Sequence, residues 1–158
     1  MIYATLKTLH LLSIIVWIGG MVFSHFFLRP AVAQLEAPAR LRLMRDVLGR
    51  FFQAVLVASL LTLVSGVWML GRVAKQVVQS GGQFEMPLAW TVMAALGIAM
   101  VAIFMHIRFA LHKRLARAVE ASDWTAGGEA LAQIRTWVSV NLGLGVIVVI
   151  VALMRWPA

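Results

Sequence analysis

Apolar residues gather in four long runs along the chain, and charged residues mark the ends of each run. The four stretches that contain no Asp, Glu, Lys or Arg lie between Lys7 and Arg29, Arg50 and Arg72, Glu85 and Arg108, and Arg135 and Arg155. Each stretch is 19 to 22 residues long, and a helix needs about 20 apolar residues to cross the hydrocarbon core of a bilayer. Strands of a membrane barrel would instead be about 10 residues long, with alternating polarity. The pattern therefore predicts four transmembrane helices.

The expected architecture is an all-α integral membrane four-helix bundle with up-down topology, formed by one domain over residues 1–158. The predicted spans cover residues 4–28, 51–71, 87–108 and 135–155. We expect the first span to be retained rather than cleaved as a signal peptide, because its apolar run exceeds the roughly 7–15 residues of a signal core. Residues 30–50 carry an amphipathic pattern with several arginines, which predicts a segment that lies at the membrane surface.

Composition indicates that lipid is the solvent of this chain. Of its 158 residues, 62% are hydrophobic and 13% are charged, whereas a soluble domain has about 45–50% apolar and about 25% charged residues. A core of this size cannot hide so much apolar surface. Cysteine is absent, which excludes disulfides, thiolate metal sites and cysteine nucleophiles. The net charge of +8 does not indicate a nucleic-acid partner, because the basic residues stand at the ends of apolar runs.

The distribution of positive charge predicts the orientation of the bundle. Four basic residues lie on the side that holds both termini and the loop at 72–86, whereas ten lie on the side of the other two loops. Since short loops rich in Lys and Arg stay in the cytoplasm, we expect both termini to be periplasmic. The predicted location is the bacterial inner membrane, as a multi-pass protein.

Histidines are the ionisable residues within the four uncharged stretches, and such groups are candidates for function because they are costly to bury in lipid. His10 falls in the periplasmic half of the first span and His25 in its cytoplasmic half. His106 in the third span lies at a depth similar to that of His25, roughly 20 Å from the level of His10. The first and third helices of an up-down bundle are diagonal partners. A haem b would fit between these two helices. Its axial ligands would be His25 and His106, or alternatively His10.

Copper is the other cofactor that the pattern supports, because imidazoles and soft thioethers bind Cu(I). Met69 and Met93 fall toward the periplasmic side, where His10 lies. The candidate metal ligands are therefore His10, His106, Met69 and Met93. Asn141, deep in the fourth span, is expected either to orient a histidine or to join helices by hydrogen bonding. Such methionines also serve as ordinary packing residues, and the residues alone leave copper and haem b both open.

Short motifs along the chain together suggest a family. They are, in chain order, Lys7-Thr8-Leu9-His10-Leu11-Leu12, Trp17-Ile18-Gly19-Gly20, Arg29-Pro30, Gly66-Val67-Trp68, His106, Arg135 and Asn141-Leu142-Gly143. With these motifs the chain resembles the copper-resistance D (CopD) family over essentially its whole length. The resemblance implies an inner-membrane protein concerned with copper uptake or tolerance.

The chain is also similar to the related HemJ-type protoporphyrinogen oxidases. They share a Lys-x-x-His opening, here Lys7 and His10, and a third-helix histidine, here His106. This resemblance implies haem b in the bundle. Two parts of the HemJ pattern are missing: a tyrosine-proline-arginine run after the first helix, and an acid and a proline after the fourth-helix asparagine, where leucines stand. These departures argue against the oxidase activity.

We interpret the chain as a membrane protein that handles a transition metal, with copper uptake or tolerance as the leading function. The alternatives are a haem b membrane redox protein, which would be a haem-dependent oxidoreductase, and a cofactor-free accessory subunit of a membrane complex. No acid lies inside any span and no serine–histidine–acid set is apparent, so no catalytic residue is predicted. Besides the lipid bilayer, the candidate partners are a periplasmic copper donor, a larger membrane complex and a second copy of the chain.

Overall fold

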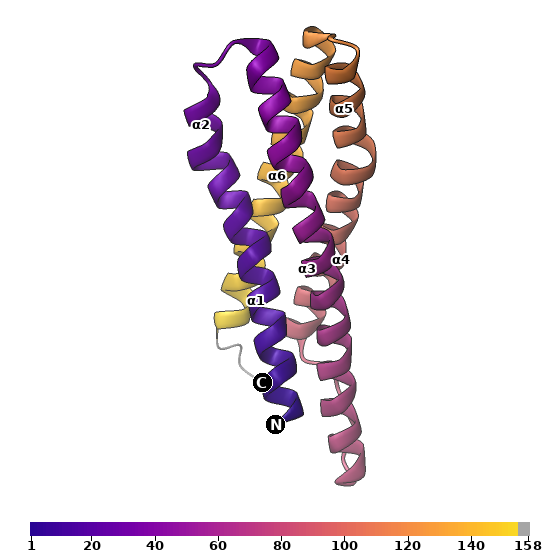
Figure 1. The fold of residues 1–158 in the computed structure, drawn as a ribbon. Helices are drawn as coiled ribbons and strands as arrows, with labels where there is room; N and C mark the ends of the chain where they lie inside the picture. Colours follow the sequence, from indigo (N-terminus) through magenta and orange to yellow (C-terminus); the bar gives the residue numbers. More distant parts are fainter. Residues whose placement is uncertain (155–158) are drawn as a thin grey trace.

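The computed structural model describes residues 1–154, and these residues are helical almost throughout, with no strand among them. The elements, in chain order, are α1 Ile2–Phe23, η1 Ser24–Leu28, α2 Arg29–Val32, α3 Ala37–Gln79, α4 Leu88–His106, η2 Ile107–Leu111, α5 His112–Glu120 and α6 Trp124–Leu153. Both η segments are π-helical and continue the helices on either side, so this part of the chain forms four long rods (Figure 1). Each rod is long and apolar enough to cross a membrane, with a mean hydropathy of 2.1 to 2.3 in its most apolar window. The prediction of an all-α four-helix membrane bundle is confirmed.

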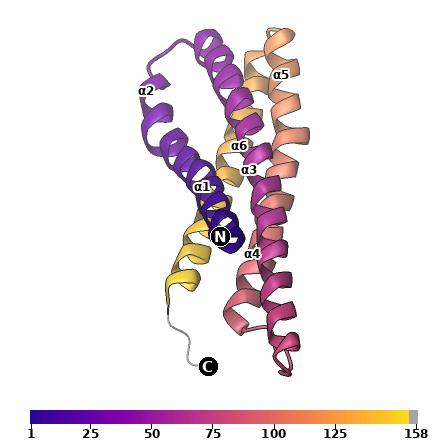
Figure 2. The ribbon, with the colours of Figure 1, turned by 60° about the horizontal axis from the view of Figure 1, so that its bottom comes forward.

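The four rods run up and down, as expected. α1 packs along α3, α4 packs along α6, and α5 contacts both α3 and α6. The first and third rods thus face each other across the bundle (Figure 2). The start of α1, the end of α3 and the end of α6 lie at one end of the bundle, which we call the terminal end, and α2 and α5 lie at the other, the α5 end. The predicted end of the fourth span, at residue 155, lies outside the described residues.

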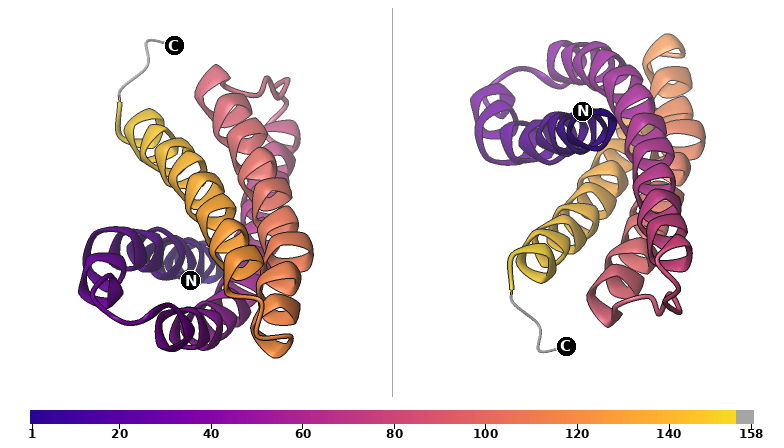
Figure 3. Two further views of the ribbon diagram at one scale, coloured as in Figure 1. Left: turned by 90° about the horizontal axis from the view of Figure 1, so that it is seen from above. Right: turned by 90° about the horizontal axis from the view of Figure 1, so that it is seen from below.

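The core lies mainly in the half of the bundle toward the α5 end. Phe104 meets both Trp17 and Phe52 edge to face, with ring centroids 5.9 and 6.1 Å apart. In the terminal half the helices spread (Figure 3), and no residue of α1 before Ser13 or of α4 before Met100 is buried. In the most apolar window of each rod, only 11 to 28% of the residues are buried. Most apolar side chains therefore point outward, as contact with lipid requires.

Residues 37–50 form the first turns of α3 rather than a separate segment at the membrane surface, so that prediction was wrong. Leu41, Met44 and Leu48 on their apolar side are buried. Leu41 lies against α6, where a Cβ placed on Gly127 would be 3.1 Å from it. An amphipathic pattern shows that one face is covered, and here the cover is protein instead of lipid.

The two π-helical segments interrupt the first and third rods toward the α5 end. Pro30 has no N–H, and its ring clashes with the carbonyl four residues before it. Because the carbonyl four residues before Pro30 belongs to η1, which ends at Leu28, the wider turn of η1 accommodates the ring. η2 contains no proline, and nothing in its sequence explains it. π-bulges are frequent at functional sites, and here they hold His25 and directly follow His106.

Candidate functional site

His10 of α1 is held against α3 in the terminal half of the bundle. Its Nδ1 lies 2.9 Å from Ser65 Oγ, and its side chain is half-buried between the two helices. Gly66 permits this close approach, because a Cβ there would be 3.3 Å from His10 Cε1. The longest helix contact of the bundle, between α1 and α3, is therefore built around a histidine.

The hydrogen bonds of Ser65 favour one tautomer of His10. A serine hydroxyl carries one hydrogen, and Ser65 donates it to the carbonyl of Leu61 on its own helix. The Ser65 oxygen therefore accepts from His10 Nδ1–H, and the neutral ring carries its lone pair on Nε2. Histidines that bind metals typically have their second nitrogen held by a hydrogen bond in this way.

Two further side chains of α3, Thr62 and Met69, lie on the same helix face as Ser65. Thr62 lies three residues before Ser65, and its Oγ1 is buried with no hydrogen-bond partner in the described part of the chain. Met69 lies four residues after Ser65, on the same helix face, and is half-buried. We call His10, Thr62, Ser65 and Met69 the α1–α3 strip. Its imidazole nitrogen and its thioether are both ligands that suit Cu(I).

His25 and His106, which the sequence puts at similar depth, contact opposite sides of α6. His25 Nδ1 lies 3.3 Å from Ser139 Oγ. The ring of His106 instead packs edge to face on Trp137, with centroids 5.6 Å apart. Residues two apart on an α-helix point in nearly opposite directions, because each residue turns the helix by about 100°. The structure therefore does not bring His25 and His106 together as the axial pair of a haem.

The remaining predicted metal ligands do not join His10. Among residues 1–154 there is no group of three or more His, Asp or Glu side chains arranged to hold a metal ion. His106 is exposed and lies in the rod across the bundle from α1. Met93 also lies in α4, which packs along α6. Of the four predicted ligands, only His10 and Met69 lie on the α1–α3 pair of helices.

Asn141 is buried in α6, with only 1% of its surface exposed. Its Oδ1 has no hydrogen-bond partner in the described part of the chain. No hydrogen bond there links it to a histidine, so the structure gives no direct sign of the expected orienting role. A buried amide oxygen without a partner is costly, which keeps Asn141 among the candidates for function.

One buried histidine is absent from the candidates that the sequence analysis named. His112 begins α5 and is 9% exposed; its Nε2 lies 3.1 Å from the carbonyl oxygen of Arg45, and its ring meets Phe52 edge to face. Burial lowers the pKa of His112, and the Arg45 carbonyl partly offsets this by raising it. The helical spacing of the apolar residues that follow was a usable signal, because it puts position 112 on the buried face of α5. These contacts give His112 a role in joining α5 to α3.

One of the comparisons with known proteins identifies a family. The family model described as "Copper resistance protein D" (CopD) matches residues 45–155. No curated protein and no solved structure matches the chain.

Proposed function

The chain belongs to the CopD family, and from this premise we propose that it receives Cu(I) in the membrane at the α1–α3 strip. Membership makes the chain a membrane protein related to copper resistance. The site rests on one observation above all: Ser65 binds Nδ1 of His10 and thereby leaves the lone pair of Nε2 for a ligand.

The assignment of the site depends on geometry, because the match to the family begins at residue 45 and does not include α1. Three features of the strip support copper. It offers one imidazole nitrogen and one thioether, which are soft or borderline ligands. It contains no carboxylate, so it does not suit the hard divalent ions that prefer oxygen ligands. Ser65 positions the ring without competing for the metal.

The surroundings of the strip support entry from the terminal end. No residue of α1 before Ser13 is buried, so few side chains cover His10 from that side. If both termini are periplasmic, as the positive charges predict, copper enters from the periplasm. In this proposal the ion is cargo, and His10 Nε2 and the Met69 sulfur are its first ligands.

The test is equilibrium Cu(I) binding to the detergent-purified full chain, measured under reducing conditions by competition with a coloured Cu(I) chelator. We expect one Cu(I) per chain and at least a tenfold weaker affinity for His10→Ala, which corresponds to about 1.4 kcal/mol. His106→Ala is the matched control, since it removes an imidazole that lies outside the strip. Its affinity should stay within twofold of that of the native chain.

Two results would overturn the proposal. The first is no measurable Cu(I) binding, and the second is equal loss in the two histidine variants. A visible spectrum of the same preparation separates copper from haem b: we expect no Soret band, because the structure places His25 and His106 on opposite sides of α6. A Soret band that disappears on mutation of His10 would assign the histidine to haem instead.

A further inference from the structure

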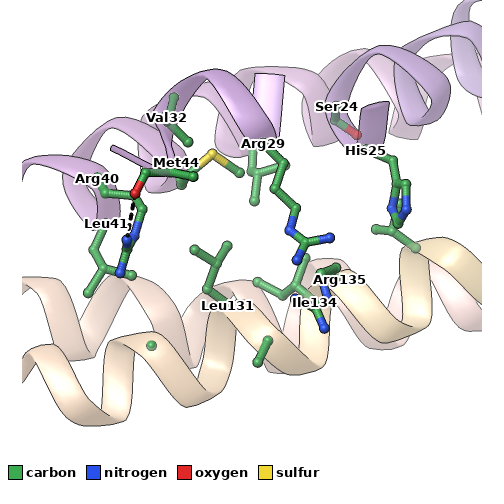
Figure 4. Close-up of a pocket in the computed structure, with 15 residues that line it drawn as sticks. Ser24, His25, Arg29, Val32, Arg40, Leu41, Met44, Leu131, Ile134 and Arg135 are labelled. Atoms are coloured by element: carbon green, nitrogen blue, oxygen red, sulfur yellow. Dashed lines mark hydrogen bonds between the residues drawn. The ribbon is translucent and has the colours of Figure 1, made fainter. Parts of the chain in front are cut away.

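A pocket of about 270 Å³ lies between the α1–α2 rod and α6 toward the α5 end (Figure 4). Its charged lining residues are all arginines, Arg29, Arg40 and Arg135, and its other polar side chains are Ser24 and His25. Figure 4 shows Arg29 reaching from the first rod toward α6, from which Arg135 projects. Arg40, at the start of α3, donates from Nη1 to the carbonyl of Ala33 at 3.4 Å. Three arginine side chains thus line one pocket.

No carboxylate balances this charge. No Asp or Glu lines the pocket, and the only ion pair among residues 1–154 joins Arg45 to Asp46, outside it. Side chains of like charge repel one another when they share a site. Arginine guanidiniums pair best with carboxylates and phosphates, which they bind in bidentate fashion. The pocket therefore has the charge of an anion site.

The rest of the lining is apolar. Val32, Met44, Leu131 and Ile134 lie around the arginines, on the three elements that form the walls. Such a lining does not suit a small hydrated anion, which would gain nothing from it. It suits an anion that carries carbon groups, because the anion can then pair with the guanidiniums while its carbon atoms contact the apolar side chains.

The pocket also lies at the right depth for a lipid. Arg29 ends the uncharged stretch of the first span, and Arg135 begins that of the fourth. Charged residues in these positions mark the boundary between hydrocarbon and headgroups. Basic pockets between helices at this boundary bind anionic headgroups.

We propose that this pocket binds the phosphate of an anionic phospholipid, with the carbon skeleton of its headgroup against the apolar walls. Arg29 and Arg135 hold the phosphate, and Arg40 adds charge at the rim. At about 270 Å³ the pocket takes a headgroup, while the acyl chains stay in the bilayer. The site is separate from the α1–α3 strip and does not rest on the copper proposal.

The test is native mass spectrometry of the delipidated full chain, titrated with dioleoylphosphatidylglycerol or dioleoylphosphatidylcholine. The native chain should retain one phosphatidylglycerol at concentrations at which phosphatidylcholine, with the same acyl chains, is not retained. The double substitution Arg29→Gln with Arg135→Gln should weaken phosphatidylglycerol binding at least tenfold. The matched control is Arg50→Gln with Arg117→Gln. It removes two exposed guanidiniums that lie in the same half of the bundle but outside the pocket. Binding to the control should change less than twofold.

Equal weakening in the two double variants would overturn the proposal, since it would assign binding to the general positive charge of this end. Equal retention of the two lipids would also overturn it. Glycerol 3-phosphate serves as a soluble competitor: if it displaces phosphatidylglycerol at a similar concentration, the ligand is a soluble phosphate and the lipid assignment fails. Circular dichroism checks the fold of each variant. If the glutamine pair does not fold, Arg29→Lys with Arg135→Lys keeps the charge, loses the bidentate geometry, and should still weaken binding severalfold; unchanged binding would contradict the proposal.

Discussion

Ser65 Oγ stands 2.9 Å from His10 Nδ1 across the α1–α3 contact, and its own hydrogen points back to the Leu61 carbonyl. The serine is thus an acceptor toward the histidine, and it holds both the tautomer and the direction of the ring. Removal of the serine hydroxyl leaves His10 present but free to rotate or to move its proton to Nε2. In the proposed copper site, this hydrogen bond would hold the ring so that Nε2 faces the ion.

The first prediction concerns Ser65→Ala, which should weaken Cu(I) binding tenfold to a hundredfold, the usual effect of removing a group that orients a metal ligand. Ser13→Ala is the control, because Ser13 is buried in α1 and donates only to the carbonyl of Leu9. Copper competition assays on both variants give the comparison. If Ser65→Ala binds copper as tightly as Ser13→Ala, the hydroxyl does not position His10.

The second prediction concerns the adjacent glycines of α1. A Cβ on Gly20 would overlap the ring of Phe51 on α3, whereas a Cβ on Gly19 would have nothing within 4 Å. Gly20→Ala should therefore lower the free energy of unfolding by about 1–3 kcal/mol through overpacking. Gly19→Ala should be neutral or slightly stabilising, because alanine is the better helix former. Thermal unfolding in detergent distinguishes them, and similar midpoints for the two variants would contradict the close contact of α1 with α3.

Sequence reasoning reached the fold because the membrane imposes a length on each span. The charged residues marked where lipid ends, but not where the helices end. α3 begins at Ala37, well before the uncharged stretch that follows Arg50, and the rod of α4 continues to Glu120. Outside the bilayer a helix is limited by caps and by its protein partners, and the amphipathic pattern of residues 37–50 did not say which partner covered it.

The candidate site was only partly predictable, because counting along a helix gives depth more reliably than direction. His25 lies within a π-helical segment, whose wider turn changes the direction of the side chains relative to a regular helix. Direction around the helix decides contact, and it sends His25 to Ser139 while His106 meets Trp137. The contact between Ser65 and His10 was likewise not predictable, because nothing in the sequence fixes the position of α1 along the axis of α3.

The third prediction concerns Asn141→Leu. Asn141 is buried and its Oδ1 makes no hydrogen bond in the described part of the chain. Replacing an unpaired polar group by an apolar one of similar size is nearly neutral or stabilising. The thermal midpoint of Asn141→Leu should therefore equal or exceed that of the native chain. A drop equivalent to more than about 1 kcal/mol would show that the amide holds helices together. Unchanged stability combined with lost Cu(I) binding would show that the Asn141 amide serves copper binding and not folding.

The last prediction concerns the pH dependence that His112 contributes to stability. Burial holds the pKa of His112 below the value of about 6.5 that it has in the unfolded chain. As pH falls through 6.5, the unfolded chain takes up the proton first, so unfolding becomes more favourable. The stabilisation by neutral His112 is therefore complete above about pH 6.5 and is lost as pH falls toward the lower, folded-state pKa.

The size of this effect is limited to about 1.4 kcal/mol for each pH unit between the two pKa values. His112→Gln isolates it, because glutamine can still donate to the Arg45 carbonyl that His112 Nε2 contacts at 3.1 Å but does not titrate. Thermal unfolding of both proteins in detergent at pH 7.5 and 5.5 should show a larger loss of stability on acidification in the native chain than in the variant. The other histidines are common to both proteins and cancel in the comparison. Equal losses would mean that His112 keeps its ordinary pKa in the fold, and a native chain that gains stability at pH 5.5 relative to the variant would mean that α5 and α3 are joined by a charged imidazolium instead.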